Sequence, residues 1–278
     1  MERYEMLPAF FVNMASRPDR LQHVEHQLSS CGITAIRIEA VTPADFPAEL
    51  EERRRAGVVT LNAGEIACSL SHRKIWRMMV ERNIPAALIL EDDVLLSADL
   101  KTVLSDPHLF DHAPDAIQLE THATAALVGR AVATAVPGVT QNRLMSSSLG
   151  TAAYVITSRL AQRLLARDDL DTMSVDSLLF GRPGGLFYEA RIFQVVPALA
   201  IQLDQTAEGK RSVAQSDLTG QRPPHRPTGP MPFRLRLKRS AKHWGHHLRI
   251  LTTFGASGDL WGARHLRLPV AQDLQPLL

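Results

Sequence analysis

The sequence has only two cysteines and no long apolar run, and each absence excludes a class of protein. Cys31 and Cys68 are too few for a disulfide framework, and both lie in apolar helical patterns, so we expect reduced thiols in a reducing cytoplasm. No stretch approaches the roughly 18 to 20 uncharged apolar residues of a membrane span. Acidic residues stand near the start, where a signal peptide has basic ones. We therefore expect a protein that is neither secreted nor integral to a membrane.

The composition is that of a globular protein with an uneven charge. Hydrophobic residues make up 45% of the 278 residues, which is enough for a sizeable core. Residues 1–205 hold 19 basic and 25 acidic side chains, whereas residues 206–278 hold 12 basic and 4 acidic ones. Residues 206–232 are polar and rich in Pro and Gly. The sequence predicts a folded domain over 1–205, a linker over 206–232 and a basic tail over 233–278.

Apolar runs alternate with helical patterns along residues 1–205, as in α/β folds. Ser16 with Asp19 resembles a capping box at the start of the first helix, and Asn62 with Glu65 caps the second. The first strand, helix and strand form a βαβ unit, which implies a parallel sheet with ligands at the carboxyl ends of its strands. Strands are predicted at residues 9–13, 36–41, 86–90, 115–119, 149–157 and 192–202. Helices are predicted at residues 16–32, 62–82 and 158–167.

The most informative point is where the apolar strand at residues 86–90 runs into Glu91, Asp92 and Asp93. Carboxylates at the end of a buried strand repel one another unless a cation or hydrogen-bond donors neutralise them. In an extended chain Glu91 and Asp93 share one face, with Asp92 on the other, so the first and third can bind one Mg²⁺ or Mn²⁺ ion. The alternative is that the triplet caps the strand and meets Lys or Arg neighbours.

Four motifs follow one another in an order typical of one enzyme family. They are Phe11-Val12-Asn13 with Arg17 and Arg20; Leu-Asn-Ala-Gly-Glu-Ile-Ala-Cys-Ser-Leu-Ser-His at residues 61–72; Leu-Glu-Asp-Asp-Val at 90–94; and Leu-Gly-Thr-Ala-Ala-Tyr-Val-Ile at 149–156. In these motifs the chain resembles glycosyltransferase family 25, the lipooligosaccharide and collagen galactosyltransferase group, over about residues 7–205. It departs from the family at Asn62, where Thr is usual, and around Asp176, where a Pro often stands nearby.

The resemblance implies a GT-A fold, which is a Rossmann-like α/β domain with a mostly parallel central sheet. It also implies inverting transfer of a hexose, such as galactose from UDP-galactose, to a lipid-linked lipopolysaccharide or lipooligosaccharide glycan. Mn²⁺ or Mg²⁺ would be the cofactor, with Glu91 and Asp93 as metal ligands and Asp176 as the general base. The reversed assignment, in which Asp92 binds the metal, stays open. The predicted donor-binding residues are Asn13, Arg17, Arg20, Ser71, His72, Asp92, Gly150 and Thr151.

Several of these residues have a plainer interpretation. Arg20 can be a solvated helix residue, and His72 can be a core histidine. Asp176 can be the N-cap of a short turn, and Gly150 with Thr151 can form a β-bulge. These alternatives stay open at the level of sequence.

The basic tail alternates cationic and apolar residues at 233–239 and continues with Lys242, His243 and Trp244. We expect it to adsorb to the anionic inner face of the inner membrane, where lipid-linked acceptors lie, and we expect no nucleic-acid partner. A solvated helix or a nucleic-acid patch is the alternative. Two rival functions remain, namely a metal-dependent nucleotidyltransferase or hydrolase, and a non-catalytic protein that binds a membrane or nucleic acid through the tail.

Overall fold

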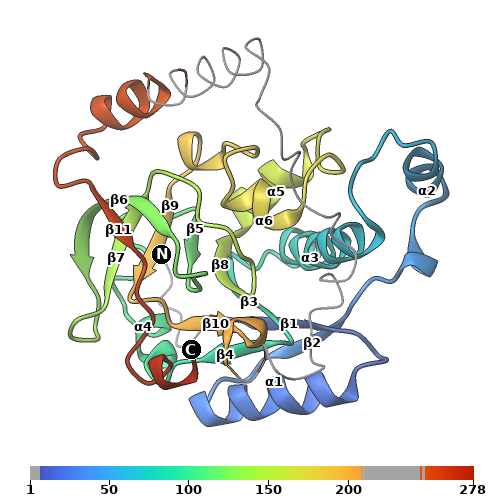
Figure 1. Cartoon of the computed structure of the whole chain (residues 1–278), viewed down its shortest axis with the longest axis horizontal. Helices are drawn as coiled ribbons and strands as arrows, with labels where there is room; N and C mark the ends of the chain where they lie inside the picture. Colours follow the sequence, from blue (N-terminus) through green and yellow to red (C-terminus); the bar gives the residue numbers. More distant parts are fainter. Residues whose placement is uncertain (1–6, 208, 210–244, 246–247) are drawn as a thin grey trace.

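The structure is a computed structural model that describes residues 7–207, 209, 245 and 248–278. Within this part, nine strands form one sheet in the order β11-β6-β7-β9-β5-β8-β3-β1-β2 (Figure 1). The sheet strands are β1 (Ala9–Asn13), β2 (Ile36–Glu39), β3 (Ala86–Glu91), β5 (Ala116–Gln118), β6 (Ala125–Ala133), β7 (Thr140–Leu144), β8 (Ala153–Thr157), β9 (Ile192–Val196) and β11 (Arg264–Arg267). A separate pair consists of β4 (Val94–Leu96) and β10 (Ala200–Gln202).

Helices of two kinds connect these strands. The labelled α-helices are α1 (Pro18–Cys31), α2 (Ala48–Arg55), α3 (Ala63–Glu81), α4 (Leu100–Leu104), α5 (Ser158–Leu165) and α6 (Val175–Leu179), and the described residues 248–256 are helical as well. Short 3-10 turns are η1 (Pro43–Asp45), η2 (Leu186–Tyr188), η3 (Leu203–Gln205) and η5 (Gln275–Leu277).

Strand direction confirms the predicted fold class. β1 pairs in parallel with β2 and β3, and β5 pairs in parallel with β9. β8 lies antiparallel between β3 and β5, so β3 and β5 point the same way. Following the pairing outward, six of the nine described sheet strands run in one direction, and β7, β8 and β11 run in the other. The carboxyl ends of β1, β3 and β5 therefore meet at one edge of the sheet.

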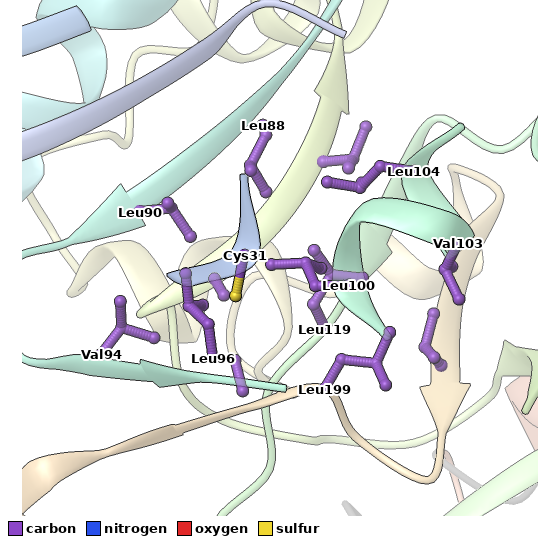
Figure 2. Close-up of a cluster of buried hydrophobic side chains, with 14 of the residues drawn as sticks. Cys31, Leu88, Leu90, Val94, Leu96, Leu100, Val103, Leu104, Leu119 and Leu199 are labelled. Carbon is purple, nitrogen blue, oxygen red and sulfur yellow. The ribbon is translucent and has the colours of Figure 1, made fainter. Parts of the chain in front are cut away.

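Alternation along the central strands gives the sheet two apolar faces. Leu88 and Leu90 of β3 face the layer that contains α1 and α4, and Figure 2 shows them in one cluster with Cys31 of α1 and Leu100 of α4. Ala87 and Ile89 face the opposite layer, which contains α3, α5 and α6. Truncating a fully buried Leu of this kind to Ala costs about 2–5 kcal/mol. The layers thus fix β3 firmly, and with it the position of the residues that follow.

The helix ends agree with the sequence at α3 and differ at α1. Asn62 accepts a hydrogen bond from the Glu65 backbone N–H, and the Glu65 carboxylate accepts one from the Asn62 N–H, both at 2.9 Å. This capping box is the predicted one, and such a cap contributes about 1 kcal/mol. The N-cap of α1 is Arg17, without a side-chain cap bond, so the Ser16–Asp19 capping box is wrong.

Several strand boundaries also differ from the prediction. β8 begins only at Ala153, and the run at residues 192–202 divides into β9 and β10. The strands β6 and β7 and the helix α2 were not predicted. Charged and small residues make up much of these elements, so their apolar periodicity is weak.

The predicted basic tail is only in part separate from the folded domain. β11 pairs antiparallel with β6 at the edge of the sheet, and Val270 bridges to Ala198. Residues 264–278 therefore belong to the same sheet and core, which corrects the predicted domain division. The basic run at 233–244 lies outside the described residues, as does most of the predicted linker. Among the described residues, no helix has both the length and the apolarity of a membrane span.

Candidate active site

Acidic side chains gather where β3 and β5 end. Glu91 is the last residue of β3, Asp92 and Asp93 follow it, and Glu120 comes two residues after β5. Thr151 lies just before β8, which runs between these two strands. The sheet topology therefore brings carboxylates from separate parts of the sequence to one edge, where parallel α/β sheets bind their ligands.

Glu91 is held by several hydrogen bonds. The Thr151 hydroxyl donates to Glu91 Oε1 at 2.7 Å, and Gln202 Nε2 donates to Oε2 at 3.4 Å. His72 Nε2 lies 3.5 Å from Oε1. Burial raises the pKa of Glu91, but the nearby His72 imidazole and the hydrogen bond from Thr151 outweigh it, so the pKa lies below its ordinary value. Glu91 is thus prepared to carry a negative charge.

His72 belongs both to the core and to the site. Its side chain is fully buried, and Nδ1 lies 2.8 Å from the Tyr154 hydroxyl, which also accepts a hydrogen bond from Trp76 Nε1 at 3.1 Å. The other ring nitrogen points toward Glu91. The two interpretations of His72 are therefore compatible, because packing fixes the ring that reaches the acidic residue.

Asp92 and Asp93 share the Arg20 guanidinium. β3 ends at Glu91 and the next two residues form a turn, so the predicted strand alternation through Asp93 is wrong. Arg20 Nη1 lies 3.2 Å from Asp92 Oδ1 and 3.4 Å from Asp93 Oδ2. Asn13 Nδ2 donates to Asp92 Oδ2 at 2.7 Å. Arg20, with 11% of its side chain exposed, is not a solvated helix residue.

Arg20 does not fully stabilise the charged form of Asp93. Burial, and next the charge of Glu91, raises the pKa of Asp93 to about 7. Its Oδ1 is buried and has no hydrogen-bond partner among the described residues. The alternative interpretation is that Lys or Arg side chains neutralise the triplet. Arg20 does so for Asp92, but it leaves one oxygen of Asp93 without a partner among the described residues. A buried carboxylate oxygen without a partner suits a hard divalent cation, so the chemistry of Asp93 and of the neighbouring Glu91 is that of Mg²⁺ or Mn²⁺ ligands.

Glu120 is a site residue that the sequence analysis missed. Its side chain is fully buried, Oε2 accepts a hydrogen bond from the Ala152 N–H at 2.9 Å, and Oε1 has no hydrogen-bond partner among the described residues. His122 Nε2 lies 3.8 Å from Oε1. Burial, and next the charge of Glu91, raises the pKa of Glu120 well above its ordinary value. The sequence could have indicated it in the same way as Glu91, because Glu120 directly follows the strand predicted at residues 115–119.

Gly150 and Thr151 position these two acids. Gly150 has a φ of +116°, and a Cβ placed there would lie 1.5 Å from Glu120 Oε1. Only glycine therefore leaves room for the Glu120 carboxyl. Both residues precede β8, so the β-bulge interpretation is wrong.

Two predicted donor-binding residues make their known contacts away from the acids. The Ser71 hydroxyl accepts a hydrogen bond from the Val41 N–H at 2.8 Å and donates to the Ala67 carbonyl at 2.7 Å. It thereby ties the chain after β2 to α3. The Arg17 guanidinium pairs with Asp19 at 2.8 Å, while its carbonyl accepts a hydrogen bond from Asn13.

Asp176 lies in the first turn of α6, near the acids. Its Oδ1 accepts hydrogen bonds from the Ser174 hydroxyl at 2.5 Å and the Ser177 N–H at 2.7 Å. The N-cap position is Ser174, so the N-cap interpretation of Asp176 is wrong. The Asp176 charge is close enough to contribute to the raised pKa of Glu120.

A GT-A-like sheet with an acidic cluster at its carboxyl edge defines a class of sugar- or nucleotide-transferring enzymes. Residues 6–179 match the model of glycosyltransferase family 25, described as an LPS biosynthesis protein. The chain belongs to glycosyltransferase family 25, and the predicted family is confirmed.

Individual relatives agree with this assignment. The chain is 23% identical to the lipooligosaccharide biosynthesis protein lic2B of Haemophilus influenzae, over 70% of this chain and 76% of the relative. It is 27% identical to the lacto-N-neotetraose biosynthesis glycosyltransferase LgtB of Neisseria gonorrhoeae, over 62% and 66%. A solved glycosyltransferase involved in glycosylation of the major capsid of PBCV-1 overlaps with a TM-score of 0.39 and 12% identity, over 74% and 96%. That last likeness is too weak to add to the family assignment.

Proposed function

We propose that this glycosyltransferase moves a hexose, with galactose from UDP-galactose as the first donor to test, onto a lipid-linked lipopolysaccharide or lipooligosaccharide glycan. The observation that carries the proposal is the cluster of Glu91, Asp93 and Glu120, in which burial and the charge of Glu91 raise the pKa values of Asp93 and Glu120 although Arg20 lies beside Asp93. A divalent cation held by Glu91 and Asp93 would offset the charge of the departing nucleotide diphosphate. Membership of family 25 and the lipooligosaccharide relatives support the acceptor class.

The remaining site residues orient the reactants in this proposal. Arg20 and Asn13 fix Asp92, which is then positioned for the donor ribose or sugar. His72 and Thr151 hold the Glu91 carboxylate. Arg17, Ser71 and Gly150 remain proposed donor contacts, although Ser71 also has a clear structural role.

Product analysis tests the reaction class. With UDP-galactose, Mn²⁺ and a lipooligosaccharide acceptor, we expect release of the nucleoside diphosphate together with a galactosylated acceptor. Release of pyrophosphate or of sugar phosphate would instead indicate the rival nucleotidyltransferase or hydrolase. A non-catalytic protein would release neither product above the rate without enzyme.

We propose that Asp176 is the general base of an inverting transfer. The acceptor oxygen attacks the anomeric carbon, the bond from that carbon to the diphosphate oxygen breaks, and the Asp176 carboxylate takes the hydroxyl proton. Its place beside the acids at the start of α6 supports this role. The Asp176→Asn variant should lose about 10²–10⁴-fold in transfer rate, with nuclear magnetic resonance showing inverted product in the wild type. The exposed Asp168→Asn is the matched control, and equal rates in the two variants would remove Asp176 from this role.

We also propose a cytoplasmic enzyme that associates with the inner face of the inner membrane. Exposed apolar side chains at Leu248, Leu251 and Trp261 precede the exposed Arg264 and Arg267, a combination that suits an anionic lipid surface. Trp261→Ser should weaken flotation with anionic vesicles, whereas the equally simple change Val58→Ser, at another exposed apolar site, should not. Equal flotation of both variants, or binding to nucleic acid in place of vesicles, would count against this location.

A further inference from the structure

A second set of metal-binding side chains lies beside the acidic cluster on its α3 side. Cys68 and His72 stand four residues apart on α3, which places them on one face of the helix, and both approach Glu91 at the end of β3. One ligand atom from each of the three residues lies within 4.8 Å of the other two. A thiol, an imidazole and a carboxylate therefore converge on one point.

The His72 ring is oriented as in metal sites. Its Nδ1 lies 2.8 Å from the Tyr154 hydroxyl, and that hydroxyl is itself held by Trp76 Nε1. Metal-bound histidines usually donate the N–H of the second ring nitrogen to a neighbouring acceptor, and the Tyr154 hydroxyl oxygen can accept it here. The His72 Nε2 atom is fully buried, has no hydrogen-bond partner among the described residues and points toward Glu91 Oε1 at 3.5 Å. An unsatisfied buried nitrogen is costly unless something binds it.

The chemistry of this set differs from that of the Glu91–Asp93 pair. Mg²⁺ and Mn²⁺ prefer oxygen ligands, whereas sulfur and imidazole ligands suit borderline ions such as Zn²⁺ and Co²⁺. We propose that Cys68, His72 and Glu91 form a binding site for Zn²⁺-like ions, distinct from the Glu91–Asp93 pair but sharing Glu91 with it. On binding, the Cys68 sulfur bonds to the ion and its thiol proton passes to solvent, so no redox partner is needed.

Sharing Glu91 gives the site a consequence for catalysis, and this part rests on the proposed function. An ion bound to Cys68 and His72 withdraws Glu91 from the Glu91–Asp93 pair. Zn²⁺ therefore inhibits a transferase that works with Mn²⁺ or Mg²⁺. Cys68 is outside the proposed catalytic residues, so its removal should leave turnover without Zn²⁺ unchanged.

Titration of the full-length protein with Co²⁺ tests the site without an activity assay. A thiolate bound to Co²⁺ produces an intense near-ultraviolet charge-transfer absorption, which carboxylate or imidazole ligands do not give. The absorption should form with one Co²⁺ per chain in the wild type and in Cys31→Ala, and be lost in Cys68→Ala and Cys68→Ser. Cys31 is a matched control, because its buried thiol lies near the Ser97 carbonyl in the opposite core layer. Absence of the absorption in the wild type, or its persistence in both folded Cys68 variants, would overturn the site.

Inhibition tests the consequence separately. Half-inhibition of Mn²⁺-dependent transfer should need at least about tenfold more Zn²⁺ in Cys68→Ser than in the wild type, since one of three protein ligands is lost. Equal sensitivity would refute the inhibitory role. If no variant shows transfer, the proposed function fails, while the Co²⁺ absorption still decides whether the site exists.

Discussion

Glu91 and Asp93 stand two residues apart, yet they lie on different sides of the acidic cluster and have different neighbouring side chains. On the α3 side, Glu91 has His72, Thr151 and Gln202 around it, and its pKa is lowered. On the α1 side, Asp93 shares Arg20 with Asp92, keeps an unsatisfied oxygen and has a pKa raised to about 7. Sequence neighbours thus differ because their partners come from different elements. A cation bound by both Glu91 and Asp93 would supply the partner that Asp93 Oδ1 lacks among the described residues.

The largest expected effect comes from removing either half of this pair. Glu91→Gln and Asp93→Asn should each lower Mn²⁺-dependent transfer by about 10³-fold, because a metal ion supplies several kcal/mol of charge stabilisation. Steady-state rates with saturating donor measure this, with the exposed Asp99→Asn as control. Near-normal rates in both site variants would mean that the two sides do not share a catalytic ion.

Gly150→Ala should cause the next largest effect, on stability. The new Cβ would lie 1.5 Å from Glu120 Oε1 at a φ of +116°, so we expect a loss of about 3 kcal/mol or more. Gly138→Ala is the matched control, because Gly138 also has a positive φ of +83° but nothing within 4 Å of its Cβ position. Denaturant unfolding measures both variants. Similar losses would show that backbone conformation, and not the buried Glu120, requires glycine at position 150.

The pKa of Asp93 is raised and that of Glu91 is lowered, so neutralising these two residues should change the stability of the metal-free protein in opposite directions. Asp93 in the folded state keeps a proton that the unfolded chain loses from about pH 4, so its contribution to stability falls as the pH rises to about 7. Asp93→Asn should therefore be more stable than wild type at pH 8 by about 1–3 kcal/mol, with little difference at pH 4. Glu91→Gln should be less stable at pH 8, because the lowered pKa of Glu91 favours its charged form.

Thermal unfolding with and without EDTA at the two pH values measures these differences. If Asp93→Asn and Glu91→Gln both stabilise or both destabilise the protein at pH 8, the proposed difference between the surroundings of Asp93 and Glu91 is contradicted. Added Mn²⁺ should reverse the order of wild type and Asp93→Asn.

The smallest effect is expected at Ser71, whose contacts lie away from the acids. Ser71→Ala loses the hydrogen bonds to Val41 and Ala67 and should cost about 1 kcal/mol of stability. If Ser71 also contacts the donor, as proposed, KM for the donor should rise several-fold. An unchanged KM would leave Ser71 with a structural role alone.

Much of the fold could be predicted because local signals agree with the final structure. The Asn62–Glu65 cap, the Gly32 helix end and the apolar strand before Glu91 all depend on residues close in sequence. The path of β11 could not be predicted in this way. Its pairing with β6 joins segments more than 120 residues apart, and its residues are largely exposed.

The sequence predicts which residues belong to the candidate site, but not their geometry. The family motifs contain Glu91, Asp93 and His72, whose roles stay a prediction, whereas the turn at residues 92–93 and the shared Arg20 depend on the packing of α1 against the sheet. Glu120 lies outside the four family motifs, and its place in the site follows from its burial, its unsatisfied oxygen and the close approach of Gly150.

The most direct test of the central claim is Mn²⁺ binding in the presence of UDP, followed by the electron paramagnetic resonance signal of free Mn²⁺. The account predicts one bound ion per chain in the wild type and strongly weakened binding in Glu91→Gln and in Asp93→Asn. Wild-type affinity in both variants would contradict it, as would transfer that continues undiminished in EDTA.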